Sequence, residues 1–179
     1  MKDNPTDVRQ SLRSELRSSL VEFHQLLDAL TDEDWRKRSR NAGWTNGEIL
    51  FHMTLGFIVV SRLVPIIRRE ARLPKRFSLQ FAHTLDFLTP PFNRINAFAA
   101  RMGGKIYNRK RIRHKFDRVH AAVIRALHRV KNDELVLGIH LPSRWDPLFG
   151  DYMTLEDVFR YPIKHFKFHR EQLSVTHHP

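Results

Sequence analysis

Cysteine is absent from this chain of 179 residues. Its absence excludes disulfide bonds, thiolate-ligated zinc and a cysteine nucleophile, and it suits a reducing compartment. The first residues, 1–7, are polar and lack the apolar core of a signal peptide. The sequence therefore predicts a cytoplasmic protein that uses no thiol of its own for chemistry.

Strand-like alternation of apolar and polar residues is also nearly absent. Apolar residues recur instead at three- and four-residue steps, as on one face of a helix. This spacing marks four long segments, at about 5–30, 45–72, 113–131 and 154–175. The length fits one domain over residues 1–179 with a sizeable core. We predict an all-α fold, a four-helix bundle.

The helical pattern is interrupted between the second and third segments, at residues 73–112. An aromatic helical run is expected at 77–88, followed by two prolines, another apolar stretch and a break at Gly103-Gly104. We predict an extra helical insertion here. A turn and basic connector are expected at 31–43, and a loop at 141–150 whose large aromatic side chains must pack on something.

One apolar run, Ile49 to Ile67, is long enough to span a membrane. His52 and Arg62 interrupt it, and such side chains are costly inside a bilayer. A buried bundle helix explains the run better, so no transmembrane segment is predicted.

Positive charge dominates the chain, because 31 Lys and Arg against 19 Asp and Glu give a net charge of +12. Nucleic acid, membrane surfaces and small acidic substrates all become candidate partners. The densest basic stretch spans 105–118, with Tyr107 and Phe116 interleaved among Lys105, Arg109, Lys110, Arg111, Arg113, Lys115 and Arg118. No helix-turn-helix, zinc-finger or RNA-recognition motif accompanies it. A non-catalytic protein that binds nucleic acid or another polyanion is the alternative interpretation.

Three of the eleven histidines could share a metal ion. His165 and His169 are four residues apart, so on a helix their Cβ atoms lie about 5–6 Å apart on one face. His52 falls in an apolar helix that Thr45 and Glu48 open with the spacing of a capping box. Burial there keeps an imidazole neutral, which is the form that binds metals. The structural alternative is a buried histidine satisfied by one hydrogen bond.

Three motifs occur in a fixed order: Trp-Thr-x-x-Glu-Ile-Leu-x-His at 44–52, Met-Thr-Leu-Glu-Asp at 153–157 and His-x-x-x-His-x-x-Gln-Leu at 165–173. Together they resemble the DinB/YfiT-like superfamily, over residues 10–70 and 115–174. The resemblance implies a four-helix bundle with a divalent zinc or nickel site. Its ligands would be His52 from the second main helix and His165 and His169 from the fourth.

Roles assigned within this family include thiol S-transferases that use bacillithiol, mycothiol or glutathione, an isomerase, and hydrolases. The resemblance therefore implies a metal-dependent transferase or hydrolase for a small-molecule substrate, with a low-molecular-weight thiol as a candidate cosubstrate and a homodimer as the assembly.

Four residues near the expected metal have positions that suggest a role. Tyr161 could donate a hydrogen bond to the site, and Gln172 could orient His169. Both residues could equally serve packing or the end of the helix. Gly56 could leave room for a substrate or allow close helix packing, and Glu48 is explained by its cap alone.

Overall fold

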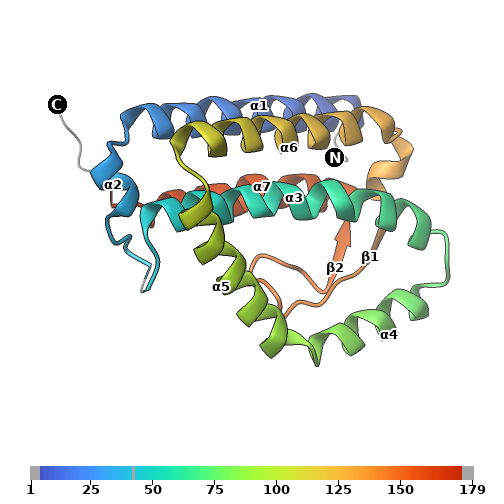
Figure 1. Cartoon of the computed structure of the whole chain (residues 1–179). Helices are drawn as coiled ribbons and strands as arrows, with labels where there is room; N and C mark the ends of the chain where they lie inside the picture. The colour runs from blue at the N-terminus through green and yellow to red at the C-terminus, as the bar shows by residue number, and fades with distance from the viewer. Residues whose placement is uncertain (1–4, 42, 175–179) are drawn as a thin grey trace.

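The computed structural model describes residues 5–41 and 43–174. Its four long helices are α1 (Pro5–Ala29), α3 (Asn46–Glu70), α6 (Arg109–Arg129) and α7 (Leu155–Arg170). They lie side by side, with α1 and α6 in one layer and α3 and α7 in the next (Figure 1). The predicted all-α four-helix bundle is confirmed.

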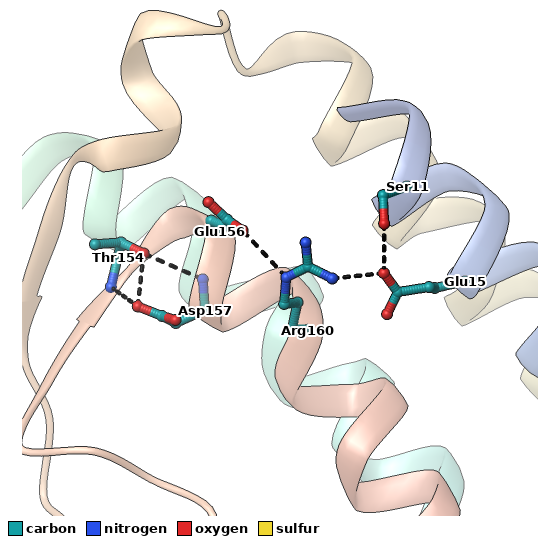
Figure 2. Close-up of polar contacts among 6 residues, drawn as sticks. All are labelled: Ser11, Glu15, Thr154, Glu156, Asp157 and Arg160. Atoms are coloured by element: carbon teal, nitrogen blue, oxygen red, sulfur yellow. Dashed lines mark hydrogen bonds and ion pairs between the residues drawn. The ribbon is translucent and has the colours of Figure 1, made fainter. Parts of the chain in front are cut away.

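Side-chain caps fix where the helices that carry the histidines begin. The Thr45 hydroxyl accepts a hydrogen bond from the Glu48 amide, and the Glu48 carboxylate accepts one from the Thr45 amide at 2.8 Å. Thr154 and Asp157 form the same capping box at the start of α7 (Figure 2). Each box satisfies two N–H groups that the first helical turn would leave unpaired. The Thr45 cap that the sequence predicts, together with the Thr154 cap, therefore sets the register of the histidines that follow.

Aromatic side chains fill the centre of the bundle. Phe23 of α1 and Phe116 of α6 stack with ring centroids 3.9 Å apart, and Phe57 of α3 meets Phe116 edge-on at 4.8 Å. Phe166 of α7 is buried beside Phe23. Burying a large apolar side chain contributes roughly 1.5–3 kcal/mol. All four helices therefore contribute to one apolar core, which holds α3 against α7.

The insertion folds into two helices, α4 (Lys75–Asp86) and α5 (Thr89–Ile106). They meet at a point far from α1 and α6 (Figure 1), which confirms the predicted helical insertion. The break expected at Gly103-Gly104 is wrong, because both glycines lie inside α5. A Cβ at Gly103 would collide with the ring of Phe51, and one at Gly104 with Glu48. The two glycines let α5 pack closely on α3.

Short elements depart from the predicted pattern. The turn expected near residue 31 is a helix, α2 (Asp32–Arg36), which Thr31 and Asp34 cap. A 3-10 helix, η1 (Asp133–Val136), precedes the antiparallel strands β1 (Gly138–His140) and β2 (Tyr152–Thr154). Strands of three residues are too short to display a period of two, so the sequence pattern did not reveal them.

Two helix ends also differ from the predicted ones. The third long helix begins at Arg109 rather than near Arg113, because the Asn108 side chain accepts a hydrogen bond from the Arg111 amide at 2.9 Å. α7 ends at Arg170, before the expected end near Val175, which lies outside the described residues, as do residues 1–4.

α3 is the one helix in the described part of the chain that is long and apolar enough to cross a membrane. Within its apolar window, 56% is buried inside the protein. That burial fits the core helix of the bundle that the sequence predicts.

Candidate metal centre

Three histidines meet where α3 packs on α7. His52 lies two turns into α3, counted from its cap, and His165 and His169 lie one turn apart on α7. Their exposed fractions are 7%, 2% and 7%. The bundle therefore brings together the three histidines that the sequence selects, although 113 residues separate His52 from His165.

The ring nitrogens of the triad, His52, His165 and His169, lie close enough to share an ion. One nitrogen from each ring lies within 4.8 Å of the others, and the Nε2 atoms of His52 and His165 are 3.1 Å apart. Two imidazoles at about 2.0–2.1 Å from one zinc ion place their nitrogens at most about 4 Å apart. The closest pair meets this limit, so the triad could hold a divalent ion after a small ring movement.

Burial keeps the three imidazoles neutral. It lowers the pKa of His52 to about 3, and the nearby His169 adds to this effect. Burial also lowers the pKa of His165 far below its usual value. It lowers the pKa of His169 too, although the hydrogen bond with Gln172 acts in the opposite direction. Neutral rings at physiological pH offer lone pairs to a metal.

Two histidines of the triad have a ring nitrogen without a hydrogen bond. Nδ1 of His52 and Nδ1 of His165 are buried and have no hydrogen-bond partner in the described part of the chain, as is also true of Nδ1 of His140, which lies 3.4 Å from the Asp151 carboxylate. Buried polar atoms are usually paired, and the buried His120, for example, meets the Leu16 carbonyl at 2.8 Å. No carboxylate lies as close to the unpaired nitrogens of His52 and His165 among the described residues, so packing alone accounts poorly for them. Three neutral imidazoles form a donor set that suits zinc and nickel.

Gln172 and Gly56 affect how the rings of His169 and His165 are placed. Oε1 of Gln172 lies 2.9 Å from Nδ1 of His169, which is the contact that the sequence spacing suggests. A Cβ at Gly56 would lie 2.8 Å from Nδ1 of His165, closer than real Cβ contacts allow. The missing side chain at Gly56 therefore makes room for a histidine of the triad as well as for the adjoining cavity.

Tyr161 contacts a carboxylate that lies beside the triad. Its ring lies beside His165, with centroids 5.4 Å apart, and its hydroxyl donates a hydrogen bond to Oδ2 of Asp146 at 2.8 Å. The same Asp146 oxygen is 3.9 Å from Nε2 of His165, and Oδ1 accepts the Leu148 amide at 2.8 Å. Burial, followed by the neighbouring Asp146 charge, raises the pKa of Tyr161, so its phenol stays protonated.

Sequence reasoning did not select Asp146 as a site residue. It lies in the 141–150 loop, where the only signal was that large aromatic side chains must pack on something. They do: Trp145 stacks on Phe92 of α5 with centroids 4.0 Å apart, and its indole N–H donates to the Leu85 carbonyl at 2.9 Å. This packing carries the adjacent Asp146 to the triad.

An apolar cavity of about 400 Å³ adjoins the triad and has His52 and His165 in its wall. α3, α4, α5, α7, β1 and the loop that follows β1 enclose it. Its volume lies in the range of about 300–1,000 Å³ that is usual for small-molecule sites. A larger hollow of about 840 Å³ lies along α1, but no histidine lines it.

The basic stretch at 105–118 is not a continuous exposed stripe. Arg109 pairs with Asp32 at 3.0 Å, Arg113 pairs with Asp28, and Phe116 is fully buried in the bundle core. These contacts give part of the stretch a structural role and leave less of it to follow a polyanion.

Comparison with protein families agrees with the geometry of the site. No curated protein and no solved structure matches the chain. The model of the DinB superfamily, however, matches residues 15–173, which include the three histidines and both capping boxes. The chain therefore belongs to the DinB superfamily.

Proposed function

We propose that this protein is a metal-dependent enzyme in which His52, His165 and His169 bind one divalent ion, zinc or nickel. The observation that carries the proposal is the convergence of three neutral, buried imidazoles, two of which, His52 and His165, line a cavity. Three protein ligands leave a coordination position open, as in catalytic rather than structural sites.

When bound, the ion supplies Lewis-acid chemistry that makes water or a thiol a better nucleophile near neutral pH. The residues beside the triad handle the proton. The Asp146 carboxylate accepts it from the nucleophile as a general base. Tyr161 positions this carboxylate through its hydroxyl, and Gln172 holds the ring of His169. A direct catalytic role of Tyr161 as a donor to the substrate stays a prediction.

The reaction is either transfer of a low-molecular-weight thiol or hydrolysis, and the cavity wall favours hydrolysis over transfer of a thiol that carries carboxylates. Glutathione is such a thiol, and its carboxylates need cationic partners. Neither Lys nor Arg is among the described residues that line the cavity, and Asp146 would repel a carboxylate. Hydrolysis uses water, which is neutral and needs no cationic side chain in the wall.

Metal content tests the site. Protein purified with zinc or nickel should contain about one ion per chain, and each alanine variant of His52, His165 and His169 should lose it. His24→Ala is the matched control, since His24 pairs with Asp117 away from the triad and should keep the ion. Full occupancy in the His165→Ala variant would contradict the proposal. A retained helical circular-dichroism spectrum excludes unfolding as the cause of the loss.

The proton acceptor is tested in the metal-loaded enzyme with neutral esters as substrates. Asp146→Asn should reduce kcat by about 10²–10⁴-fold while metal content is unchanged. Tyr161→Phe keeps the ring and removes only the positioning hydroxyl, so its loss of kcat should be smaller. Turnover of an electrophile only when bacillithiol, mycothiol or glutathione is added would assign transfer instead of hydrolysis.

Other expectations from the sequence stay predictions. These are the single domain over 1–179, the homodimer and the cytoplasmic location. Polyanion binding by the 105–118 stretch is the alternative function. It predicts DNA binding that persists after metal removal and weakens steeply with salt, and a lack of binding at low salt would end it.

A further inference from the structure

We infer that the substrate is a neutral, largely apolar small molecule, bound with its polar end at the triad and its apolar part under the α4–α5 insertion. The inference rests on the proposed function for the identity of the polar end. The shape and chemistry of the cavity carry the rest.

The cavity has a polar end at the triad, and the rest of its wall is apolar apart from Asn96 and His140, whose Nδ1 lies 3.4 Å from the Asp151 carboxylate. His165, Asp146 and Tyr161 form the polar end. Aliphatic and aromatic side chains form most of the remaining wall, including Leu55 and Leu63 of α3, Leu85 of α4 and Phe92 of α5. A ligand with one polar end and an apolar body matches this division, because burying its apolar surface stabilises the complex.

Charge selection follows from the lining. A chain of net charge +12 has many Lys and Arg side chains, yet none of the described residues that line the cavity is Lys or Arg. Trp145 is also unavailable as a donor, because its indole N–H is used by the Leu85 carbonyl. Asn96 adds a neutral amide to the wall. The proposed ion would meet only the polar end of a ligand, and no Lys or Arg of the described lining balances a negative charge elsewhere. In the metal-free cavity an anionic ligand would therefore lose its hydration without gaining a Lys or Arg partner, so this cavity selects against it.

Partly exposed apolar side chains mark the entrance. Val59, Ile66 and Phe81 line the cavity, and their exposed fractions are 40%, 49% and 58%. Residues that belong to both the cavity wall and the molecular surface lie where the cavity meets solvent. The entrance is therefore itself apolar and lies between α3 and α4.

Calorimetry on metal-free protein tests the inference separately from the metal. Neutral alkyl amides of about six to about twelve carbons should bind about fourfold more tightly with each added methylene, until the chain outgrows the cavity. Octanoate should bind at least about tenfold more weakly than octanamide, since it lacks a cationic partner. Affinity that is independent of chain length, or octanoate binding as tight as octanamide, would overturn the inference.

A charge placed at the entrance localises the binding. Ile66 is exposed enough for the protein to tolerate the Ile66→Lys substitution. The lysine should weaken octanamide binding because it removes apolar surface from the entrance, and it should improve octanoate binding because it supplies a cation. Val136→Lys introduces the same charge at a side chain that is 73% exposed and outside the cavity wall, and it should change neither. Equal effects of the two variants would show that the amides bind elsewhere and would overturn the inference.

The two proposals fail in different ways. If alkyl amides bind but the protein has no stoichiometric metal site, the proposed function is wrong and the assignment of the cavity stands. If the metal site is present but alkyl amides do not bind, the proposed function stands and the assignment of the cavity is wrong.

Discussion

The four-helix bundle and the α4–α5 insertion are built differently, although both are helical. Side-chain caps begin α3, α6 and α7, whereas α4 and α5 begin without a side-chain hydrogen bond at the N-cap. Large buried aromatic side chains join the bundle helices, while the buried residues of α4 and α5 are only Ala82, Ala100 and Gly103.

The exposed side chains complete the contrast. Phe87 at the junction of α4 and α5 is 84% exposed, and Phe98 of α5 is 63% exposed. The bundle therefore supplies the rigidity that the proposed metal ligands require, and α4 and α5 add one side of the cavity wall to the side that α3 provides. The difference teaches that the histidines are positioned by the bundle alone, whereas the cavity beside them is enclosed by the bundle and the insertion together.

The strongest test of the contrast is a pair of phenylalanine truncations. Phe116→Ala should lower the free energy of unfolding by about 3–5 kcal/mol, because it removes a ring stacked on Phe23 and leaves a cavity in the core. Phe87→Ala removes the same atoms from an exposed position and should change stability by less than about 0.5 kcal/mol. Denaturant unfolding measures both. Similar losses would mean that the insertion is as important to stability as the bundle.

A glycine substitution sharpens the contrast at the triad. Gly56→Ala places a Cβ 2.8 Å from Nδ1 of His165, so it should displace the ring, reduce metal affinity and cost about 1–3 kcal/mol of stability. Gly150→Ala has its nearest neighbour at 3.5 Å and should behave as the unaltered protein. Metal titration and thermal unfolding read out the two effects, and unchanged metal affinity in the Gly56→Ala variant would contradict the close-contact argument.

Removing a cap tests whether helix starts set the register. Thr154→Ala deletes the hydroxyl of the α7 capping box (Figure 2) and should cost about 0.5–2 kcal/mol. Thr154→Ser keeps a hydroxyl and should recover most of the loss. The control in the insertion is Thr84→Ala, where the hydroxyl bonds only to the Gln80 carbonyl within α4. If Thr84→Ala lowered the free energy of unfolding as much as Thr154→Ala, the capping hydroxyl would contribute no more than any other helical hydroxyl.

The smallest effect concerns an ion pair that joins α1 to α7. Burial raises the pKa of Glu15, but the Ser11 hydroxyl and the Arg160 guanidinium outweigh it, so the pKa is lowered overall (Figure 2). A carboxylate with a lowered folded pKa stabilises the protein above its unfolded pKa of about 4.3, and this contribution is lost as pH falls through the folded value.

Glu15→Gln should therefore lower stability at pH 7 by less than about 1 kcal/mol, because both partners are partly exposed. The difference from the unaltered protein should vanish in acid. Glu33→Gln, at an exposed position of α2, is the control for the change in net charge. A Glu15→Gln deficit that persists well below pH 4 would assign the effect to packing rather than to the ion pair.

The sequence reveals those parts of the site that depend on local rules. Capping boxes and four-residue spacing are local patterns, so His52, His165, His169 and the contact of Gln172 with His169 could all be anticipated from the chain. The four bundle helices follow from the period of their buried residues.

Asp146, the cavity and the inner part of α5 could not be anticipated in the same way. Asp146 reaches Tyr161 only because Trp145 packs on Phe92, which is a long-range contact without a local signature. Glycine usually disfavours a helix. At Gly103 a side chain would collide with the ring of Phe51 on α3, and this long-range contact explains why a glycine lies inside α5. Tertiary packing decided both.

The sequence separation between the ligands has a consequence for the lifetime of the fold. The ion we propose would tie His52 to His165 across 113 residues, acting as a reversible cross-link in a chain that cannot form a disulfide. Because such an ion binds the folded state and not the separated helices, its free concentration would add to stability by mass action. Melting temperature would then rise with metal supply, and a metal-starved cell would hold a shorter-lived form of the protein.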